Sequence, residues 1–275
     1  MSVRGGGALV TGAGRGLGRE IALALAARGH TVHVTDVDGV AAEAVAVACG
    51  GDSFASVLDV RDGEACRAAA RETARRAGTL AVWVNNAGIL PTGSGWDQDE
   101  AQRRTAFEIN ALGTINGTLA ALELMRPAGA GNVVNVVSLA GLVAAPGQTL
   151  YSATKHAAIA FSIGTQSDLR RAGERGVRVS ALCPDGIWTP MLFAKVDDPE
   201  AAASWTGVLL QPADVAARAV RLLDRPKPVT VMPRWRGPIL RFYDATPGLG
   251  LRLLPLVMAD ARRRQRRWKA KHAER

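Results

Sequence analysis

Cysteine, aromatic residues and long apolar runs are all scarce in this sequence. Its 275 residues include three cysteines, Cys49, Cys66 and Cys183, whose number and spacing match neither a disulfide framework nor a zinc motif. We therefore expect no metal site and a cytoplasmic protein, since a reducing compartment keeps thiols free. No run of about 18 apolar residues is present, so no segment is expected to span a membrane. The first apolar run, Ala8-Leu9-Val10, leads into a glycine-rich turn, which argues against a signal peptide.

An excess of charge of one sign is also missing from most of the chain. The net charge is +9, yet residues 234–275 hold 12 lysines and arginines against 3 acidic residues. The other 233 residues carry 22 basic and 22 acidic side chains and are therefore neutral. With 48% hydrophobic residues, the chain can form a substantial core. We divide it into a main domain, residues 1–233, and a basic amphipathic C-terminal extension, residues 234–275.

Short apolar, β-branched segments alternate with helical segments along the main domain. The segments expected as strands are Gly7–Val10, Thr31–Asp36, Ser53–Val60, Leu80–Asn85, Val133–Val137, Gly176–Cys183 and Pro228–Met232. Long helices are expected over Asp62–Ala77, Asp97–Met125 and Pro212–Asp224, with another from Tyr151. This alternation indicates an α/β fold with a doubly wound parallel sheet of seven strands, the Rossmann arrangement.

The stretch from Ser138 to Lys155 carries the residues best suited to chemistry. Ser138 ends a buried strand, while Tyr151 and Lys155 lie four residues apart and hence on one face of a helix. A phenol has a pKa of about 10, and a neighbouring ammonium would lower it by favouring the phenolate. With the Ser138 hydroxyl on the same oxygen, these groups could move a proton on or off an alcohol. A packed ring beside a solvated amine is the alternative for any Tyr-x-x-x-Lys pattern.

A glycine-rich turn follows the first expected strand and precedes an alanine-rich helix. Glycine allows a tight turn and a close approach of backbone to ligand, and the helix N-terminus offers free N–H groups to a pyrophosphate. The spacing is not G-x-G-x-x-G, and a merely flexible turn is the alternative, but the strand before it and the helix after it favour a dinucleotide site. The residues expected there are Gly12, Gly14, Arg15, Gly16, Leu17 and Gly18.

Asp36 ends the second expected strand, 18 residues after Gly18. A carboxylate there would accept hydrogen bonds from an adenosine ribose and repel a 2′-phosphate, which favours NAD over NADP. Arg15 favours the opposite choice, because a basic side chain neutralises that phosphate. We predict that Asp36 dominates, since its charge would have to be desolvated against the phosphate. Its alternative role is as N-cap of a helix that begins near Val40.

Four patterns in this chain agree in type and order with the short-chain dehydrogenase/reductase family. They are Thr-Gly-x-x-x-Gly-x-Gly at 11–18, Asn-Asn-Ala-Gly at 85–88, Asn110, and Ser138 with Tyr151-x-x-x-Lys155. Residues 5–232 therefore resemble this family, in its single-domain Rossmann branch. The resemblance implies that residues 1–233 form an NAD(P)-binding catalytic domain.

The resemblance also implies a role for each matching residue. Tyr151 is the general acid or base, Lys155 lowers its pKa and holds the nicotinamide ribose, and Ser138 orients the substrate oxygen. Asn110 holds a water that connects Lys155 to solvent. Further implied cofactor contacts are Asp59, Val60, Asn86, Ala87, Gly88, Pro184, Ile187 and Thr189. Asp185 departs from the family pattern, which has glycine after Pro184, and leaves the local backbone open.

Bulky apolar side chains gather around and after Thr189, where a substrate loop is expected. An apolar loop over a hydride-transfer site suggests an apolar substrate, while packing against the domain or another subunit is the alternative. The residues expected at the substrate are Gln148, Trp188, Met191, Leu192, Phe193 and Trp205.

Residues 234–275 combine an apolar stretch, Leu249–Ala259, with a basic end that contains Trp268. This pattern resembles an interfacial anchor on anionic lipid at the inner membrane face, and we expect it to be dispensable for chemistry. A nucleic-acid arm and a solvated helix end are the alternatives. We favour the membrane surface, because the neutral main domain offers nucleic acid no further contacts and the apolar half needs burial.

The sequence thus predicts an oxidoreductase that interconverts a secondary alcohol and a ketone on an apolar small molecule of steroid, retinoid or long-chain type. NAD is the expected cofactor and NADP the second choice. A 3-oxoacyl reductase using NADPH and a cofactor-binding regulator without turnover are the alternatives. The resemblance implies a homotetramer or homodimer built through the Asp97–Met125 and Tyr151–Arg171 helices. No specific nucleic-acid partner is expected.

Overall fold

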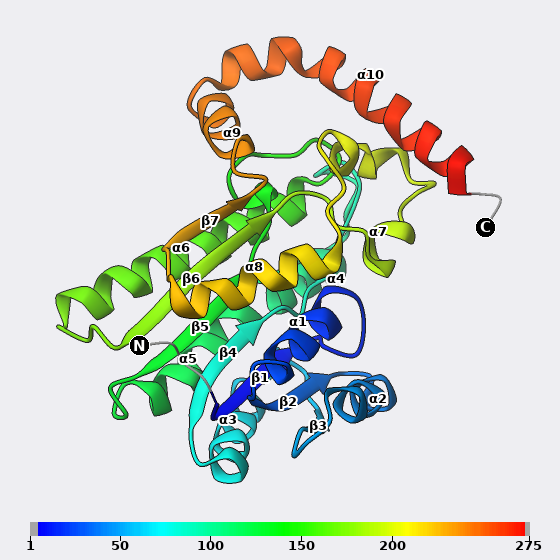
Figure 1. Cartoon of the computed structure of the whole chain (residues 1–275). Coiled ribbons are helices and arrows are strands. Elements are labelled where there is room, and N and C mark those ends of the chain that lie inside the picture. Colours follow the sequence, from blue (N-terminus) through cyan, green and yellow to red (C-terminus); the bar gives the residue numbers. More distant parts are fainter. Residues whose placement is uncertain (1–4, 273–275) are drawn as a thin grey trace.

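A parallel sheet of seven strands lies at the centre of the computed structural model, which describes residues 5–272 (Figure 1). The strands are β1 (Gly7–Thr11), β2 (Thr31–Asp36), β3 (Phe54–Val57), β4 (Leu80–Asn85), β5 (Gly131–Val136), β6 (Val177–Pro184) and β7 (Val229–Met232). Their spatial order is β3-β2-β1-β4-β5-β6-β7, which confirms the predicted doubly wound sheet. The order reverses between β1 and β4, and a crevice opens where strand order reverses in such sheets.

Helices cover both faces of this sheet. One layer holds α1 (Gly16–Ala26), α2 (Gly39–Cys49) and α8 (Pro212–Asp224), and the other holds α3 (Gly63–Ala77), α5 (Gly113–Met125) and α6 (Thr149–Arg171). Alternate strand residues face opposite layers: Ala8 and Val10 pack in the first core cluster, and Leu9 packs in the second. Strands covered on both faces need such continuous apolar runs, which is why the sequence pattern located them well.

The single helix expected over Asp97–Met125 is divided into three parts. α4 (Glu100–Phe107) begins with a capping box, in which Asp99 accepts from the Gln102 amide at 2.7 Å and the Gln102 side chain accepts from the Asp99 amide at 3.1 Å. A π-helical turn, Glu108–Leu112, separates α4 from α5 and contains the fully buried Asn110. The third expected strand is shorter than predicted, so Asp59 and Val60 lie in the loop after β3.

Residues 236–272 form two helices, α9 (Arg236–Ala245) and α10 (Pro247–His272), which we call the arm. In Figure 1 the arm leaves β7 and crosses above the sheet toward α7 (Pro190–Phe193). Its far end packs on residues 188–210, which we call the substrate loop, chiefly on a short 3₁₀ helix, η3 (Pro199–Trp205). No helix within residues 5–272 is long and apolar enough to cross a bilayer. The charge distribution alone indicates a separate C-terminal extension, whereas the structure places the arm against the main domain.

The contact between the arm and the substrate loop is specific, and we call it the latch. Gln265 is buried, and its Nε2 lies 2.8 Å from the carbonyl of Asp198 and 3.1 Å from that of Val196. Trp268 lies against Phe193 and Trp188, with ring centroids 5.4 and 4.4 Å away. The latch therefore closes with both hydrogen bonds and aromatic packing.

We predict that Gln265→Ala with Trp268→Ala loosens the far end of the arm, because both kinds of contact are lost together. Local opening exposes helical backbone, so trypsin should cleave at least severalfold faster within Arg262–Arg267. Timed proteolysis followed by mass spectrometry measures this rate. Trp235→Ala removes an exposed indole outside the latch and should leave the rate unchanged. Equal cleavage of the double variant and the unaltered protein would contradict the latch.

Candidate active site

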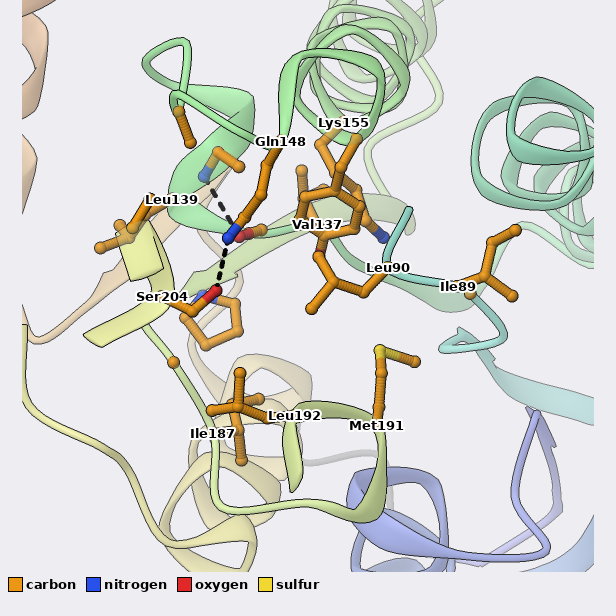
Figure 2. A pocket seen from close by; sticks show the side chains of 18 of the residues that line it. Ile89, Leu90, Val137, Leu139, Gln148, Lys155, Ile187, Met191, Leu192 and Ser204 are labelled. Atoms are coloured by element: carbon orange, nitrogen blue, oxygen red, sulfur yellow. Dashed lines mark hydrogen bonds between the residues drawn. The ribbon is translucent and has the colours of Figure 1, made fainter. Parts of the chain in front are cut away.

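A cavity of about 1280 Å³ lies at the carboxyl ends of the strands, between the sheet and the arm. The glycine turn after β1, the ends of β4, β5 and β6, the start of α6 and the substrate loop form its walls. Figure 2 shows apolar side chains on both sides of this space, with Leu90 and Val137 on the sheet side and Met191 and Leu192 on the substrate loop. The cavity brings the expected catalytic, cofactor and substrate segments together.

Tyr151 and Ser138 meet at the floor of the cavity. A hydrogen bond joins their side chains, and the Ser138 hydroxyl also accepts from the Ala140 amide at 3.1 Å. The short helix that starts there, Leu139–Gly141, thus fixes the Ser138 side chain at the end of β5. Burial raises the pKa of Tyr151 to about 12, although the hydrogen bond with Ser138 acts in the opposite direction. The phenol is therefore protonated at neutral pH and suited to donate a proton.

Lys155 lies one turn after Tyr151 on α6, with its Nζ 5.6 Å from the centre of the Tyr151 ring. The ammonium donates to the Val136 carbonyl at 3.2 Å, and burial lowers the pKa of Lys155 to about 8. The sequence predicts that Lys155 lowers the phenol pKa below its ordinary value. In the structure the pKa of Tyr151 is raised instead, because burial is the largest influence on it.

Asn110 faces neither solvent nor the cavity but joins three segments around Lys155. Its Oδ1 accepts from the Ile89 amide at 2.8 Å, and its Nδ2 donates to the Ile89 carbonyl at 2.9 Å and to Thr154 Oγ1 at 3.1 Å. Thr154 directly precedes Lys155, so Asn110 holds the loop after β4 against the start of α6. The π-helical turn directs the side chain inward, as such turns often do at functional sites. The water relay through Asn110 stays a prediction.

The glycine turn is held to β4 by a network of short hydrogen bonds. Asn86 Nδ2 donates to the carbonyls of Thr11 at 3.0 Å and Gly12 at 2.9 Å, while Thr11 Oγ1 accepts from the Asn86 and Ala87 amides. Gly12 has a φ of 60°, and a side chain there would collide with Ala87. Asn86 thus shapes the turn, in addition to lining the cavity beside Ala87 and Gly88.

Asp36 reaches back to the same turn from the end of β2. Its Oδ2 accepts from the Gly14 amide at 2.9 Å and its Oδ1 from the Asp38 amide at 3.1 Å. The alternative role as N-cap of α2 is wrong, since Asp38 occupies that position and accepts from Ala41. Asp36 and Arg15 both line the cavity. The two side chains expected to act in opposite directions on the choice between NAD and NADP therefore lie in the same cavity.

Most of the other expected cofactor contacts also line the cavity. They are Gly12, Gly16, Leu17, Gly18, Asp59, Val60, Pro184, Ile187 and Thr189. Gly14 is set back from the cavity wall and acts through its hydrogen bond to Asp36. Asp59 makes an ion pair with Arg61 that lowers the pKa of its carboxyl, which keeps it charged at this edge.

The expected substrate residues separate into two groups. Gln148, Met191 and Leu192 line the cavity, and Gln148 donates to Ser204 Oγ at 2.8 Å, which Figure 2 shows as a dashed line. Trp188, Phe193 and Trp205 do not line it, which corrects their expected placement. The first two pack with Trp268 in the latch, and Trp205 is buried in the core of the substrate loop. Here the alternative of packing holds, because large flat rings gain most by mutual burial.

Sequence reasoning missed the cavity wall that the arm contributes. Tyr243, Leu254, Val257 and Met258 line the cavity together with Ile89 and Leu90 of the loop after β4. The spacing of Gly250, Leu254, Met258, Ala261 and Gln265 was a visible signal, since residues three and four apart share one helix face. The net charge of the segment reflects mainly the basic residues on the opposite face of the same helix.

Asp185 accounts for the unusual sequence after β6. Its carboxylate lies 3.2 Å from Nε of Arg236, at the start of the arm, and both side chains are largely buried. Burial raises the pKa of Asp185, and Arg236 opposes that rise. No residue other than glycine has a positive φ in the described range 5–272, so aspartate fits the backbone here without strain. The departure from the family pattern ties β6 to the arm.

Known proteins match this chain in both sequence and structure. A family model described as short chain dehydrogenase matches residues 7–200. An L-fucose dehydrogenase of Bos taurus is 38% identical over 224 residues, 78% of this chain and 81% of that protein. A 3-oxoacyl-[acyl-carrier-protein] reductase of Staphylococcus aureus is 37% identical over 196 residues, 70% of this chain and 78% of that protein. A crystal structure of a short chain dehydrogenase/reductase from Burkholderia phymatum in complex with NAD has a TM-score of 0.82 at 25% identity, and the match covers 91% of this chain and 96% of that one.

We predict that in the Lys155→Met variant the free energy of unfolding varies less with pH in the alkaline range. The pKa of Lys155 falls from 10.5 to about 8 on folding, so the charged form opposes folding below pH 8 and this cost disappears between pH 8 and 10.5. The variant should gain up to about 3 kcal/mol relative to the unaltered protein at pH 7, and less above pH 8. Denaturant unfolding at several pH values measures the difference. Lys227→Met, at an exposed site, serves as control, and a difference that does not vary with pH would contradict the argument.

Proposed function

The chain belongs to the short-chain dehydrogenase/reductase family, and from this premise we propose that it interconverts a secondary alcohol and a ketone on an apolar small molecule, with NAD as preferred cofactor. As a family member it is an NAD(P)-dependent oxidoreductase that acts on CH–OH groups. The observation that carries the finer proposal is the hydrogen-bonded pair of Ser138 and Tyr151 at the floor of a cavity with apolar walls.

The proposed chemistry at this floor is the transfer of one proton. The Ser138 hydroxyl holds the substrate oxygen, and Tyr151 donates its proton to that oxygen in reduction or accepts one from it in oxidation. Lys155, one helical turn away, offsets the negative charge that a phenolate would carry. The nicotinamide cofactor, when bound, supplies or accepts the hydride. Asn110 positions Lys155 through Thr154 and does not touch the reacting atoms in this scheme.

The preference for an apolar substrate is supported by the walls above this floor. Leu90, Val137, Leu139, Met191 and Leu192 approach it from the sheet and the substrate loop. The arm adds Leu254, Val257 and Met258 from above. Burying a large apolar ligand against such walls contributes roughly 25 cal/mol per Å². Steroid, retinoid and long-chain alcohols fit this description, whereas a small polar sugar would leave most of the wall without a partner.

Two alternatives deserve a direct comparison. The Staphylococcus aureus relative is named a 3-oxoacyl-[acyl-carrier-protein] reductase, so a thioester-linked 3-oxoacyl chain with NADPH is the rival within the enzyme class. A regulator that binds cofactor without turnover is the rival outside it, and the assembled Ser138, Tyr151 and Lys155 set argues against that role. A screen of alcohols, ketones and 3-oxoacyl thioesters with both cofactors, read by absorbance, separates the three.

We also propose a homodimer or homotetramer built through α4, α5 and α6. Phe107, Leu119 and Ile163 expose apolar side chains on these helices and Leu112 does so on the π-helical turn between α4 and α5, with 36 to 48% of each accessible in the single chain. Mass measurement by light scattering on the purified protein tests this assembly. Leu119→Ser together with Ile163→Ser should dissociate the oligomer if these helices form the contact.

We predict that Tyr151→Phe lowers kcat by at least about 1000-fold, because it removes only the hydroxyl that carries the proton. NADH binding, followed by fluorescence, should change little, since the ring and Lys155 remain in place. Tyr243→Phe removes the other phenol of the cavity wall, belongs to the arm, and serves as the matched control with activity retained. Activity of Tyr151→Phe above a small fraction of the original would exclude Tyr151 as the acid or base.

We predict that kcat/KM is higher with NAD than with NADP. Asp36→Ala should lower the ratio of the two kcat/KM values. The carboxylate repels a 2′-phosphate and accepts from ribose hydroxyl groups, and its removal leaves Arg15 to act alone. Asp38→Ala is the matched control, because it removes a nearby carboxylate that caps α2 at a cost of about 1 kcal/mol in stability. That control should leave the ratio unchanged. A preference for NADP in the unaltered protein would reverse the ranking of Asp36 and Arg15.

A further inference from the structure

The arm turns two apolar stripes outward. On and just before α9, Trp235, Ile239 and Phe242 follow one another at helical spacing and are 55, 48 and 58% exposed. On α10, Leu249, Leu253 and Leu256 do the same, and Leu256 is 71% exposed. The opposite stripe of α10 faces the cavity and the latch, as Gly250, Ala261 and Gln265 are buried. Large apolar side chains gathered on an outer face mark an interaction surface.

The same helix carries a strong positive charge beyond its apolar half. Pro247–His272 contains eight lysines and arginines and one acidic residue. Arg264 pairs with Asp260, and Lys269 pairs with Asp197 of the substrate loop. Arg262, Arg263, Arg266 and Arg267 are exposed around the remaining circumference. The surface therefore combines leucine and tryptophan with arginine, which fits an anionic layer that has an apolar interior.

The mouth of the cavity adjoins this surface. Ile239, Leu251 and Val257 line the cavity, and each is also substantially exposed, at 48, 69 and 38%. They form an apolar rim between the cavity and the outer stripes.

We infer that the outer face of the arm docks on an anionic membrane surface, with the cavity mouth opening toward the lipid. Leucine, isoleucine and phenylalanine side chains enter the headgroup region, while the arginines of α10 bind lipid phosphates. A nucleic acid would use the arginines and leave the two apolar stripes exposed. A second copy of this chain would cover the stripes but would bring two clusters of like charge together. The docking does not depend on the proposed substrate, and its test does not require activity.

Co-sedimentation of the full-length protein with vesicles tests the docking. We expect the protein to bind vesicles that contain phosphatidylserine or phosphatidylglycerol and to bind neutral phosphatidylcholine vesicles at least tenfold more weakly. Binding should weaken with added salt, because charge attraction is screened within about 10 Å at 0.1 M. Arg262, Arg263, Arg266 and Arg267 changed together to Gln should lower the partition coefficient strongly, since each basic residue contributes about fivefold.

The apolar stripe has its own variant and a matched control. Leu249, Leu253 and Leu256 changed together to Ser should lower binding by at least about tenfold, because three apolar side chains no longer enter the lipid. Val40, Val47 and Val57 changed together to Ser remove three exposed apolar side chains far from the arm and should bind as the unaltered protein does. Thermal melting and NADH fluorescence show that both variants are folded.

Three outcomes would overturn the inference. Absence of binding to anionic vesicles excludes the membrane as partner. Binding that depends on the arginines but not on the three leucines points to an acidic macromolecule. Conversion of a dimer to a monomer by the leucine variant, measured by light scattering, with vesicle binding unchanged, assigns the stripe to a second copy.

Discussion

Burial of an ammonium beside a phenol is the constraint on which the rest of this structure depends. Lys155 is 4% exposed, and water gives it almost no solvation, so the surrounding backbone has to hold it. The Val136 carbonyl does so directly, and Asn110 keeps the adjacent turn of α6 in place. The π-helical turn between α4 and α5 exists at the point where Asn110 has to reach inward. A helix irregularity, a strand end and a loop are thus all organised around one charge.

The sheet and the meeting of Ser138, Tyr151 and Lys155 at one cavity could be predicted because their signals are local. Buried parallel strands are continuous apolar runs, and the Tyr151–Lys155 spacing fixes one helix face without tertiary information. The π-helical turn could not be predicted, because Asn110 disturbs an otherwise regular helical pattern by a contact 44 residues away, with Thr154. The placement of Trp188 and Phe193 depended on Trp268, which lies far along the chain. The role of Asp185 likewise could not be predicted, because it depends on the ion pair with Arg236.

The helix α10 shows how one helix can be interpreted in two ways from sequence. The composition of the whole segment does not reveal that its leucines form two stripes with different neighbours. The stripe that contains Leu254 and Met258 belongs to the cavity, and the stripe that contains Leu249 and Leu256 faces outward. Composition describes both, but only helical phase and a partner surface separate them.

The arm supplies several side chains to the cavity and few to the sheet, where Leu240 packs beside β6 and β7, and this division has a consequence for how the cavity can vary. Substitutions at Leu251, Leu254, Val257 or Met258 can reshape the space above Tyr151 without disturbing α6 or the end of β5, which position Tyr151 and Ser138. One wall of the cavity and the Ser138–Tyr151 pair thus sit on separate structural modules, joined by the Asp185–Arg236 pair at one end and the latch at the other. Changes confined to the arm would therefore alter the shape of the cavity while leaving Ser138, Tyr151 and Lys155 in their arrangement.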